Sequence, residues 1–338
     1  MKSAIQAAIA RAVERQDLSK DEARQGMEQI LAGKATPAQI AGLAVALRMK
    51  GETPDEIAGM AEAMRHRVPP ILTRRLPLLD TCGTGGDNAG TFNISTTVAL
   101  VTASCGVAVA KHGNRAVSSR AGSADVLEML GVSIELTPED AARSIDLVGI
   151  AFLFAPNYHI ALSHASGPRR ELGLRTVFNL LGPLTNPAGA KRQLLGVYSD
   201  TLVRPVAEVL QRLGSERAWV VHSRDGLDEL SVFAPSHVAE LHNGAITEFE
   251  VDPKSLGFAH TDRAGISGGA AAENAKIIRS VLAGGLGPAR DIVVLNAAAA
   301  LVVGGVARDL EEGIGKARQA IDSGAAARKL EDLAAFRG

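Results

Sequence analysis

The expected fold follows from one stretch, Leu79-Asp80-Thr81-Cys82-Gly83-Thr84-Gly85-Gly86-Asp87, in which a short apolar strand ends directly in a glycine-rich loop. A polar run, Asn93-Ile94-Ser95-Thr96-Thr97, then opens a predicted helix. Three glycines let backbone N–H groups point inward, and a helix N-terminus adds further donors. The loop fits neither the P-loop nor the dinucleotide-binding motif. By itself it indicates a phosphate site or a tight turn capped by Asn93, with neither favoured.

Strand-like and helix-like segments alternate around and after this loop. Alternation of this kind predicts a mostly parallel sheet with helices on both faces, and ligands in such sheets bind beyond the carboxyl ends of the strands. Helices are expected at 95–105 and 123–130, from 137 onward, and from 271 to the C-terminus, with an irregular β region at 231–252. The predicted strands are 76–81, 107–110, 132–136, 150–154, 193–198 and 218–222.

The segment before the loop has a different character and predicts a small all-helical domain. Ser19, Thr36 and Thr53 each precede Glu or Gln by three residues, the spacing of a capping box. The Pro-Pro pair at 69–70 then breaks the helical pattern. We therefore expect an N-terminal helical domain at 1–70 and an α/β catalytic domain at 71–338.

A second strand end carries positive charge. The strand at 107–110 runs directly into Lys111-His112-Gly113-Asn114-Arg115, followed by Ser118-Ser119 and by Ser123 at a helix start. These groups are able to bind anionic oxygen. Alone, such a run is more often a solvated basic loop, but two polar loops at consecutive strand ends indicate a shared anion site.

A third strand end carries the adjacent carboxylates Asp228 and Glu229. Like charges about 4 Å apart repel by about 4 kcal/mol at an effective dielectric near 20, so this pair fits a polyanion site only with a bridging cation. Mg²⁺ is the natural choice, because it takes one or two carboxylates together with substrate phosphates and water. An exposed acidic turn is the competing interpretation.

Composition excludes several classes. The 338 residues contain 36 Lys+Arg and 37 Asp+Glu, a balance that argues against a dedicated nucleic-acid or membrane-surface binder. Cys82 and Cys105 are too few for a disulfide framework or a zinc set, which favours a reducing cytoplasm. No apolar run is long enough to cross a membrane, and the longest, at 292–306, reads as a buried helix.

Together these motifs resemble the anthranilate phosphoribosyltransferase family over essentially the whole chain. The resemblance implies a nucleoside-phosphorylase-like α/β domain behind a helical domain, and a homodimer formed through the helical domain. It also implies transfer of phosphoribosyl from phosphoribosyl diphosphate to the amine of anthranilate, with two Mg²⁺ ions per monomer and no covalent nucleophile. The motifs that carry it are Gly83–Asp87, Asn93–Thr97, Lys111–Arg115, Gly122–Glu128, Val177–Asn186 and Asp225–Glu229.

The resemblance also implies roles for individual positions. Mg²⁺ is expected at Ser95, Asp228 and Glu229, and anthranilate at Gly83, Asn114 and Arg169. A planar guanidinium suits the anthranilate carboxylate. For His112 two roles stay open, acceptance of the amine proton or a structural one. Phosphoribosyl diphosphate is expected at Gly83, Gly86, Asp87, Thr91, Asn93, Ile94, Ser95, Thr96, Lys111, His112, Gly113, Asn114, Arg115, Ala116, Val117, Ser118, Ser119 and Ser123.

Three rival functions remain to be weighed. A pyrimidine nucleoside phosphorylase would share the fold, but it uses free phosphate and leaves Asp228 and Glu229 without a role. A non-catalytic nucleic-acid-binding relative is expected to be basic, which this chain is not. An inactive structural relative would tolerate losses in the motifs, and none is seen.

Overall fold

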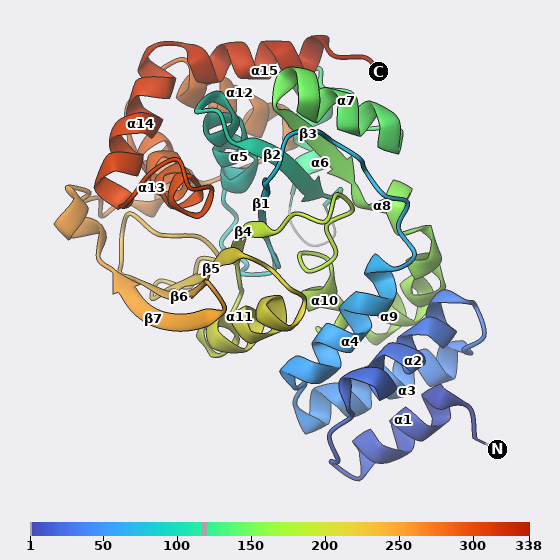
Figure 1. Cartoon of the computed structure of the whole chain (residues 1–338). Coiled ribbons are helices and arrows are strands. Elements are labelled where there is room, and N and C mark those ends of the chain that lie inside the picture. The colour runs from blue at the N-terminus through green and yellow to red at the C-terminus, as the bar shows by residue number, and fades with distance from the viewer. Residues whose placement is uncertain (1, 117–119) are drawn as a thin grey trace.

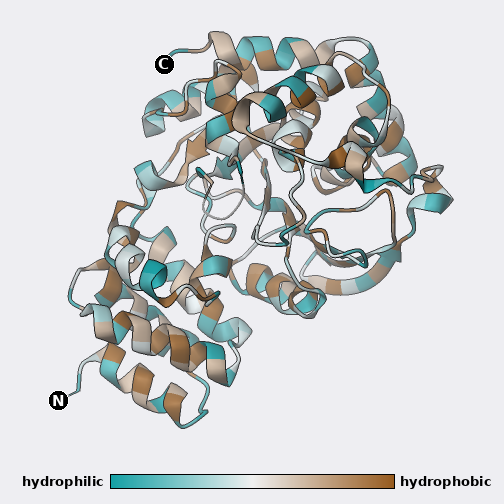
Figure 2. Cartoon of the chain, turned by 180° about the vertical axis from the view of Figure 1, so that it is seen from behind, coloured by the Kyte–Doolittle hydropathy of each residue, from teal (hydrophilic) through white to brown (hydrophobic). Residues whose placement is uncertain are grey.

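The computed structural model describes residues 2–116 and 120–338. Its N-terminal part is a bundle of four helices, coloured blue in Figure 1: α1 (Ala4–Val13), α2 (Lys20–Leu31), α3 (Pro37–Lys50) and α4 (Pro54–Arg65). Ser19, Thr36 and Thr53 each close the predicted capping box, which confirms the three expected helix starts. Figure 2 shows hydrophobic and hydrophilic bands alternating along these helices, because one side of each faces the bundle core.

The larger part of the molecule is built on one seven-stranded sheet in the order β3-β2-β1-β4-β5-β6-β7. The first five strands in the sequence are parallel, and β6 and β7 extend the sheet antiparallel. This confirms the expected α/β class. The strands are β1 (Leu78–Gly83), β2 (Ala108–Gly113), β3 (Ile150–Phe154), β4 (Arg192–Gly196), β5 (Arg217–Ser223), β6 (Ser236–His242) and β7 (Ala245–Val251).

Helices cover both faces of the sheet. On one face a large core holds Leu79, Val109 and Trp219 against helices such as α5 and α13. On the other face, α7 covers β2 and β3, while α11 and the N-terminal bundle share one core with β4, β5 and β6. The helices are α5 (Ile94–Ser104), α6 (Ser123–Met129), α7 (Pro138–Val148), α8 (Ala155–Tyr158), α9 (Ser166–Leu172), α10 (Phe178–Leu181), α11 (Val203–Arg212), α12 (Ala271–Leu282), α13 (Pro288–Val303), α14 (Leu310–Asp322) and α15 (Ala325–Ala335).

The N-terminal bundle also packs against a later part of the chain. Helix α9 lies against α3, and α10 lies against α4, as the green segments beside the blue bundle show in Figure 1. Phe178, Leu180 and Leu181 belong to the same core cluster as the bundle helices. The proposed boundary at residue 70 therefore marks a change along the sequence, while the small lobe in space includes the segment around α9 and α10.

One expected strand was wrong, and one expected β region is more regular than predicted. Residues 132–136 form no strand, although Val132, Ile134 and Leu136 alternate inward as a strand would. Only alternate side chains of the segment are buried, and β2 is the only strand that pairs with β3 in the described sheet. The region expected to be irregular at 231–252 holds instead the regular hairpin of β6 and β7. Its turn is Asn243-Gly244, both at positive φ, a pair that favours a tight hairpin turn.

Candidate active site

The predicted loops meet at the point where the sheet reverses its strand order. β1 pairs with β2 on one side and with β4 on the other, so the strand order reverses between β1 and β4. Ligands of open α/β sheets bind at such a switch point. The three polar motifs expected from the sequence lie at the ends of β1 and β2 and in the loops that follow β1, β2 and β5. Lys111, His112 and Gly113, expected in a loop, lie within β2, which is longer than the predicted strand at 107–110.

The acidic loop after β5 crosses directly over the ends of β1 and β4. A Cβ on Gly196 would lie 1.6 Å from the Asp228 carbonyl oxygen, and one on Gly83 would lie 2.6 Å from Asp228 Oδ2. Both strands must therefore end in glycine for the loop to pass. The predicted residue Gly83 thus gives Asp228 the space to reach the centre of the site.

The glycine loop is tied to the same two neighbours. Thr84 N–H donates to the Gly196 carbonyl at 2.8 Å, and Gly85 N–H donates to Asp228 Oδ2 at 3.0 Å. Gly85 and Gly86 have φ values of 64° and 81°, a left-handed conformation that favours glycine. One inward N–H is thus engaged by a carboxylate, and the loop and the acidic pair form one unit.

Three carboxylates gather here. The Asp228 N–H faces Asp87 Oδ2 at 3.5 Å, and burial together with the nearby Asp87 charge raises the pKa of Asp228 to about 7. Burial and the Asp228 charge raise the pKa of Glu229 well above its ordinary value, while Lys111 and the Ser95 N–H act in the opposite direction. Crowded carboxylates of this kind are stabilised in their charged form by a cation.

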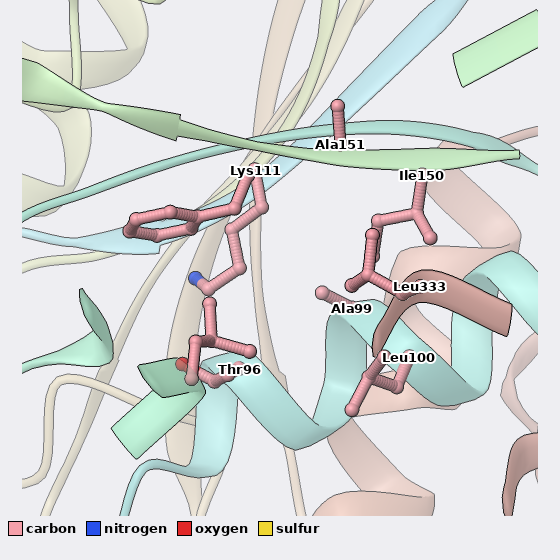
Figure 3. A pocket seen from close by; sticks show the side chains of 9 residues that line it. Thr96, Ala99, Leu100, Lys111, Ile150, Ala151 and Leu333 are labelled. Atoms are coloured by element: carbon pink, nitrogen blue, oxygen red, sulfur yellow. The ribbon is translucent and has the colours of Figure 1, made fainter. Parts of the chain in front are cut away.

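Lys111 supplies one positive charge from inside the protein. The side chain is buried, and its Nζ donates to the Thr81 carbonyl at 2.5 Å and to Ser95 Oγ at 3.3 Å. Figure 3 shows the ammonium group directed toward Thr96 at the start of α5, beside a small apolar cavity. Burial lowers the pKa of Lys111, and the Asp80 and Glu229 carboxylates oppose that effect. Lys111 therefore balances carboxylate charge from below the loops.

The start of α5 is held by two amide contacts. Asn93 Nδ2 donates to the Ala121 carbonyl at 3.2 Å, and Asn93 Oδ1 accepts from Asn274 Nδ2 at 2.9 Å. Asn93 therefore links the start of α5 to the loop before α6 and to α12. The neighbouring Ser95 contributes its N–H to Glu229, as described above.

The loop after β2 is directed toward α6. Arg115 is exposed and pairs with Asp125 at 3.0 Å and with Glu128 at 2.5 Å. Ser123 Oγ donates to the Asn114 carbonyl at 3.2 Å, and the side chain of Asn114 is exposed. Among the expected ligands in this loop, Val117, Ser118 and Ser119 lie outside the described residues.

His112 is buried beneath the site. Its Nδ1 lies 3.1 Å from the Gly182 carbonyl, and its ring meets His159 edge-on at 5.2 Å. Burial lowers the pKa of His112 to about 3 and that of His159 to about 4, so both rings are neutral at pH 7. The Nε2 atoms of both rings have no hydrogen-bond partner in the described part of the chain.

Arg169 on α9 is a half-buried cation that packs against an aromatic ring. Its guanidinium lies over the Phe178 ring at 5.6 Å, and burial lowers its pKa. No carboxylate of the described residues lies within ion-pair distance of it. An anionic group of a ligand would complete this environment.

One residue at the site had no signal in the sequence. Arg175 donates from Nη2 to the Gly86 carbonyl and lies over the Tyr198 ring at 4.7 Å. It therefore connects the glycine loop to the segment after β4. Its partner Gly86 is 89 positions away, so no local motif could have indicated the contact.

Comparisons with known proteins agree on one family. The glycosyl transferase family a/b domain matches residues 75–327, and the helical bundle domain of the glycosyl transferase family matches residues 6–68. An anthranilate phosphoribosyltransferase of Moorella thermoacetica is 54% identical over 332 residues, which cover 98% of each chain.

Solved structures give the same result. The crystal structure of anthranilate phosphoribosyltransferase from Thermus thermophilus superposes with a TM-score of 0.92 at 46% identity, covering 97% of this chain and 98% of that chain. The anthranilate phosphoribosyltransferase of Saccharomyces cerevisiae, in complex with PRPP and Mg, superposes with a TM-score of 0.88 at 27% identity. That match covers 98% of this chain and 97% of the yeast chain.

Proposed function

This chain belongs to the anthranilate phosphoribosyltransferase family, and we propose that it transfers the phosphoribosyl group of 5-phosphoribosyl 1-diphosphate to the amine of anthranilate. The product, N-(5-phosphoribosyl)anthranilate, belongs to tryptophan biosynthesis. The observation that carries the proposal is the meeting of Asp228, Glu229 and the glycine loop over the switch point of the sheet. A relative with the same fold holds both PRPP and Mg.

The residues present fit a magnesium ion. Asp228 and Glu229 offer hard oxygen ligands, and Ser95 Oγ lies beside them near Lys111 Nζ. No three acidic, histidine or cysteine side chains of the described residues form a complete metal cage. That arrangement suits Mg²⁺, which takes one or two carboxylates and completes its shell with phosphate oxygens and water. When bound there, Mg²⁺ would neutralise charge on the diphosphate leaving group. We infer two ions per monomer.

The reaction asks for alignment and charge stabilisation more than for a nucleophilic side chain. The bond from the anthranilate nitrogen to C1 of the ribose forms while the bond from C1 to the diphosphate oxygen breaks, and the amine loses a proton. Lys111 holds positive charge beneath the leaving group, and the N-terminus of α5 adds its dipole. Asn114 and Arg169 orient anthranilate, the latter through its carboxylate.

The remaining contacts with phosphoribosyl diphosphate in the proposal come from the ends of β1 and β2, the loops that follow them, and the starts of α5 and α6. They are Gly83, Gly86, Asp87, Thr91, Asn93, Ile94, Ser95, Thr96, Lys111, His112, Gly113, Asn114, Arg115, Ala116 and Ser123, with Val117, Ser118 and Ser119 from the part that is not described. Gly83 would face both substrates. Because Arg115 is engaged with α6, its contact with the donor requires exchange of the Asp125 and Glu128 partners.

A homodimer through the helical domain is the second part of the proposal. Val13 and Met49 are 68% and 70% exposed on α1 and α3, two bundle helices that pack against each other, and we take them as candidate interface residues. We also infer a cytoplasmic location, since Cys82 and Cys105 are free thiols. No described helix is long and apolar enough to cross a membrane.

Anthranilate fluorescence provides the test. The signal is expected to fall only when phosphoribosyl diphosphate and Mg²⁺ are both present, and to stay constant when EDTA removes the metal. A parallel assay with a pyrimidine nucleoside and inorganic phosphate is expected to show no release of base. Constant fluorescence at saturating substrates and Mg²⁺ would sink the assignment.

A further inference from the structure

The fully buried Asn296 side chain in α13 hydrogen-bonds the backbone of the residue next to the acidic pair. Asn296 is 0% exposed, in a helix where four alanines follow it. Its Oδ1 accepts from the Leu230 N–H at 2.9 Å, and its Nδ2 donates to the Leu230 carbonyl at 2.8 Å and to the Ile292 carbonyl at 2.9 Å. Both donors of the amide are thus used, which is what a buried amide requires.

This contact anchors the acidic loop on its C-terminal side. Leu230 directly follows Glu229 and is itself fully buried, so its position sets where the Glu229 backbone leaves the core. On the other side, Arg263 Nη1 donates to the Asp225 carbonyl at 2.9 Å, and Ser231 Oγ donates to Asp225 Oδ2 at 2.9 Å. Between these anchors, the Asp228 N–H makes only the long 3.5 Å contact with Asp87 among the described residues.

A short loop that carries like charges needs such an anchor. Asp87, Asp228 and Glu229 repel one another, and each would move apart if the backbone allowed it. Helix α13 is a rigid support because nearly all of it is buried in the main core. The Asn296 amide transmits that rigidity to the loop through two hydrogen bonds to a single residue.

We propose that Asn296 is a positioning residue for the divalent-cation site, which sets the place of the Glu229 carboxylate through Leu230. Asn296 touches neither cation nor substrate. The proposal rests on the proposed function for the existence of that cation site. It adds a residue from α13, far from the three sequence motifs, to the machinery that holds the metal.

The test measures cation binding directly. Mn²⁺ serves as the probe, and its dissociation constant is read by electron paramagnetic resonance with phosphoribosyl diphosphate present. Loss of a group that hydrogen-bonds a metal ligand typically weakens metal affinity by about 10- to 100-fold, and Asn296 acts through the residue next to Glu229, so the lower end of that range applies. Asn296→Asp keeps the size of the side chain but loses both hydrogen bonds that Nδ2 donates. For this variant we expect the Mn²⁺ dissociation constant to rise by about tenfold. The KM for anthranilate is expected to change less than about twofold, because Arg169 lies on another element.

Two further variants make the result decisive. Asn296→Ala replaces Asn296→Asp if the buried charge prevents folding, since alanine suits this helix. Leu301→Ala lies in the same helix and core and loses packing, but the Leu301 backbone carbonyl accepts from Val306 and Ala307, away from the acidic loop. Urea unfolding measures the free energy of unfolding of each variant, so that variants of similar stability are compared. Leu301→Ala is expected to leave the Mn²⁺ dissociation constant unchanged.

The outcomes separate this inference from the proposed function. Unchanged Mn²⁺ affinity in a folded Asn296 variant, or equal weakening by Leu301→Ala, would overturn the positioning role. The cation site itself would be overturned if the wild-type protein failed to bind Mn²⁺. It would also be overturned if the Asp228→Ala variant bound Mn²⁺ as tightly as the wild type. Weakened binding in the Asn296 variant alone, with intact binding in the helix control, supports the proposal.

Discussion

At the scale of single residues, the site is organised by charged side chains that are shielded from water. Lys111 is buried between Asp80 and Glu229, and Asp228 lies against a second carboxylate. Such groups are costly to bury unless they are paired. Arg169 shows the opposite condition, because no described carboxylate lies within ion-pair distance of it. This makes Arg169 the clearest residue for a substitution test.

Replacing Arg169 with alanine is expected to raise the KM for anthranilate by about 10- to 100-fold, the value of a charged hydrogen bond of about 1.5–3 kcal/mol. The KM for phosphoribosyl diphosphate should change less than about twofold. Initial rates measured with each substrate varied in turn give both constants. Arg170→Ala, an exposed neighbour on the same helix, is the control. Equal effects of Arg169→Ala on both KM values would place Arg169 outside the anthranilate site.

The buried histidines predict how stability depends on pH. His112 and His159 have folded pKa values of about 3 and about 4, below the ordinary value near 6.5. The unfolded chain therefore binds more protons below pH 6.5, and stability falls as pH decreases from there. Between pH 6.5 and pH 5 we expect a loss of up to about 2 kcal/mol per histidine in the free energy of unfolding.

Urea unfolding of His159→Phe checks this prediction. The variant should lose less stability than the wild type over that pH range, whereas His66→Gln, an exposed control, should follow the wild type. Comparing variants cancels the contribution of Asp228, whose raised pKa acts in the opposite direction. Identical slopes for His159→Phe and the wild type would contradict the assignment of a neutral buried pair.

At the scale of elements, the decisive feature is that β1 and β4 both end in glycine beneath the acidic loop. Each strand end alone looks like an ordinary turn. The reason for both glycines is visible only in the structure, where Asp228 crosses both strand ends. A Cβ on Gly83 would lie 2.6 Å from Asp228 Oδ2, and one on Gly196 would lie 1.6 Å from the Asp228 carbonyl oxygen. The strand order thus creates the switch point, and the glycines that end β1 and β4 leave the space there for the acidic loop.

Gly196→Ala is expected to displace the acidic loop. The added methyl would meet the Asp228 carbonyl, and overpacking of this kind typically costs about 1–3 kcal/mol, or more where backbone must move. Activity should fall even where the protein stays folded, because the proposed Mg²⁺ ligands shift with the loop. Gly315→Ala in α14 has no neighbour within 4 Å and should be neutral or slightly stabilising. Rate assays and urea unfolding compare the two, and full activity of Gly196→Ala would refute the argument.

At the scale of the whole molecule, the helical bundle and the sheet share one continuous core with α11 and the segment at 178–184. Helix α9, which carries Arg169, packs against α3 of the bundle. The position of the proposed anthranilate contact therefore depends on the bundle. Association through the bundle would brace the same side of the site.

The proposed dimer predicts a defined change in mass. Met49→Glu is expected to convert a dimer into a monomer in light scattering coupled to gel filtration, because a charge would be buried in the interface. Leu286→Glu, at the exposed turn between α12 and α13, should leave the dimer intact. A monomeric wild type, or a dimer that survives Met49→Glu, would argue against association through the helical domain.

Local signals in the sequence determined a large part of this protein. Capping boxes at Ser19, Thr36 and Thr53 set helix starts because they act over three residues, and the strand at 150–154 was found with its bounds. The α/β alternation and the combined motifs indicated the class and the family, which the comparisons confirm. The missed turn Asn243-Gly244 was also within reach of local reasoning.

Tertiary structure alone decided what joins distant segments. Residues 132–136 have the alternation of a strand, yet a strand requires a partner, and none of the described strands pairs there. Arg175 and Asn296 reach Gly86 and Leu230 across 89 and 66 positions, and neither lies in a motif. A sequence specifies which side chains are available for chemistry. The order of strands and the packing of α13 decide which of them meet, because those contacts form only when the core is complete.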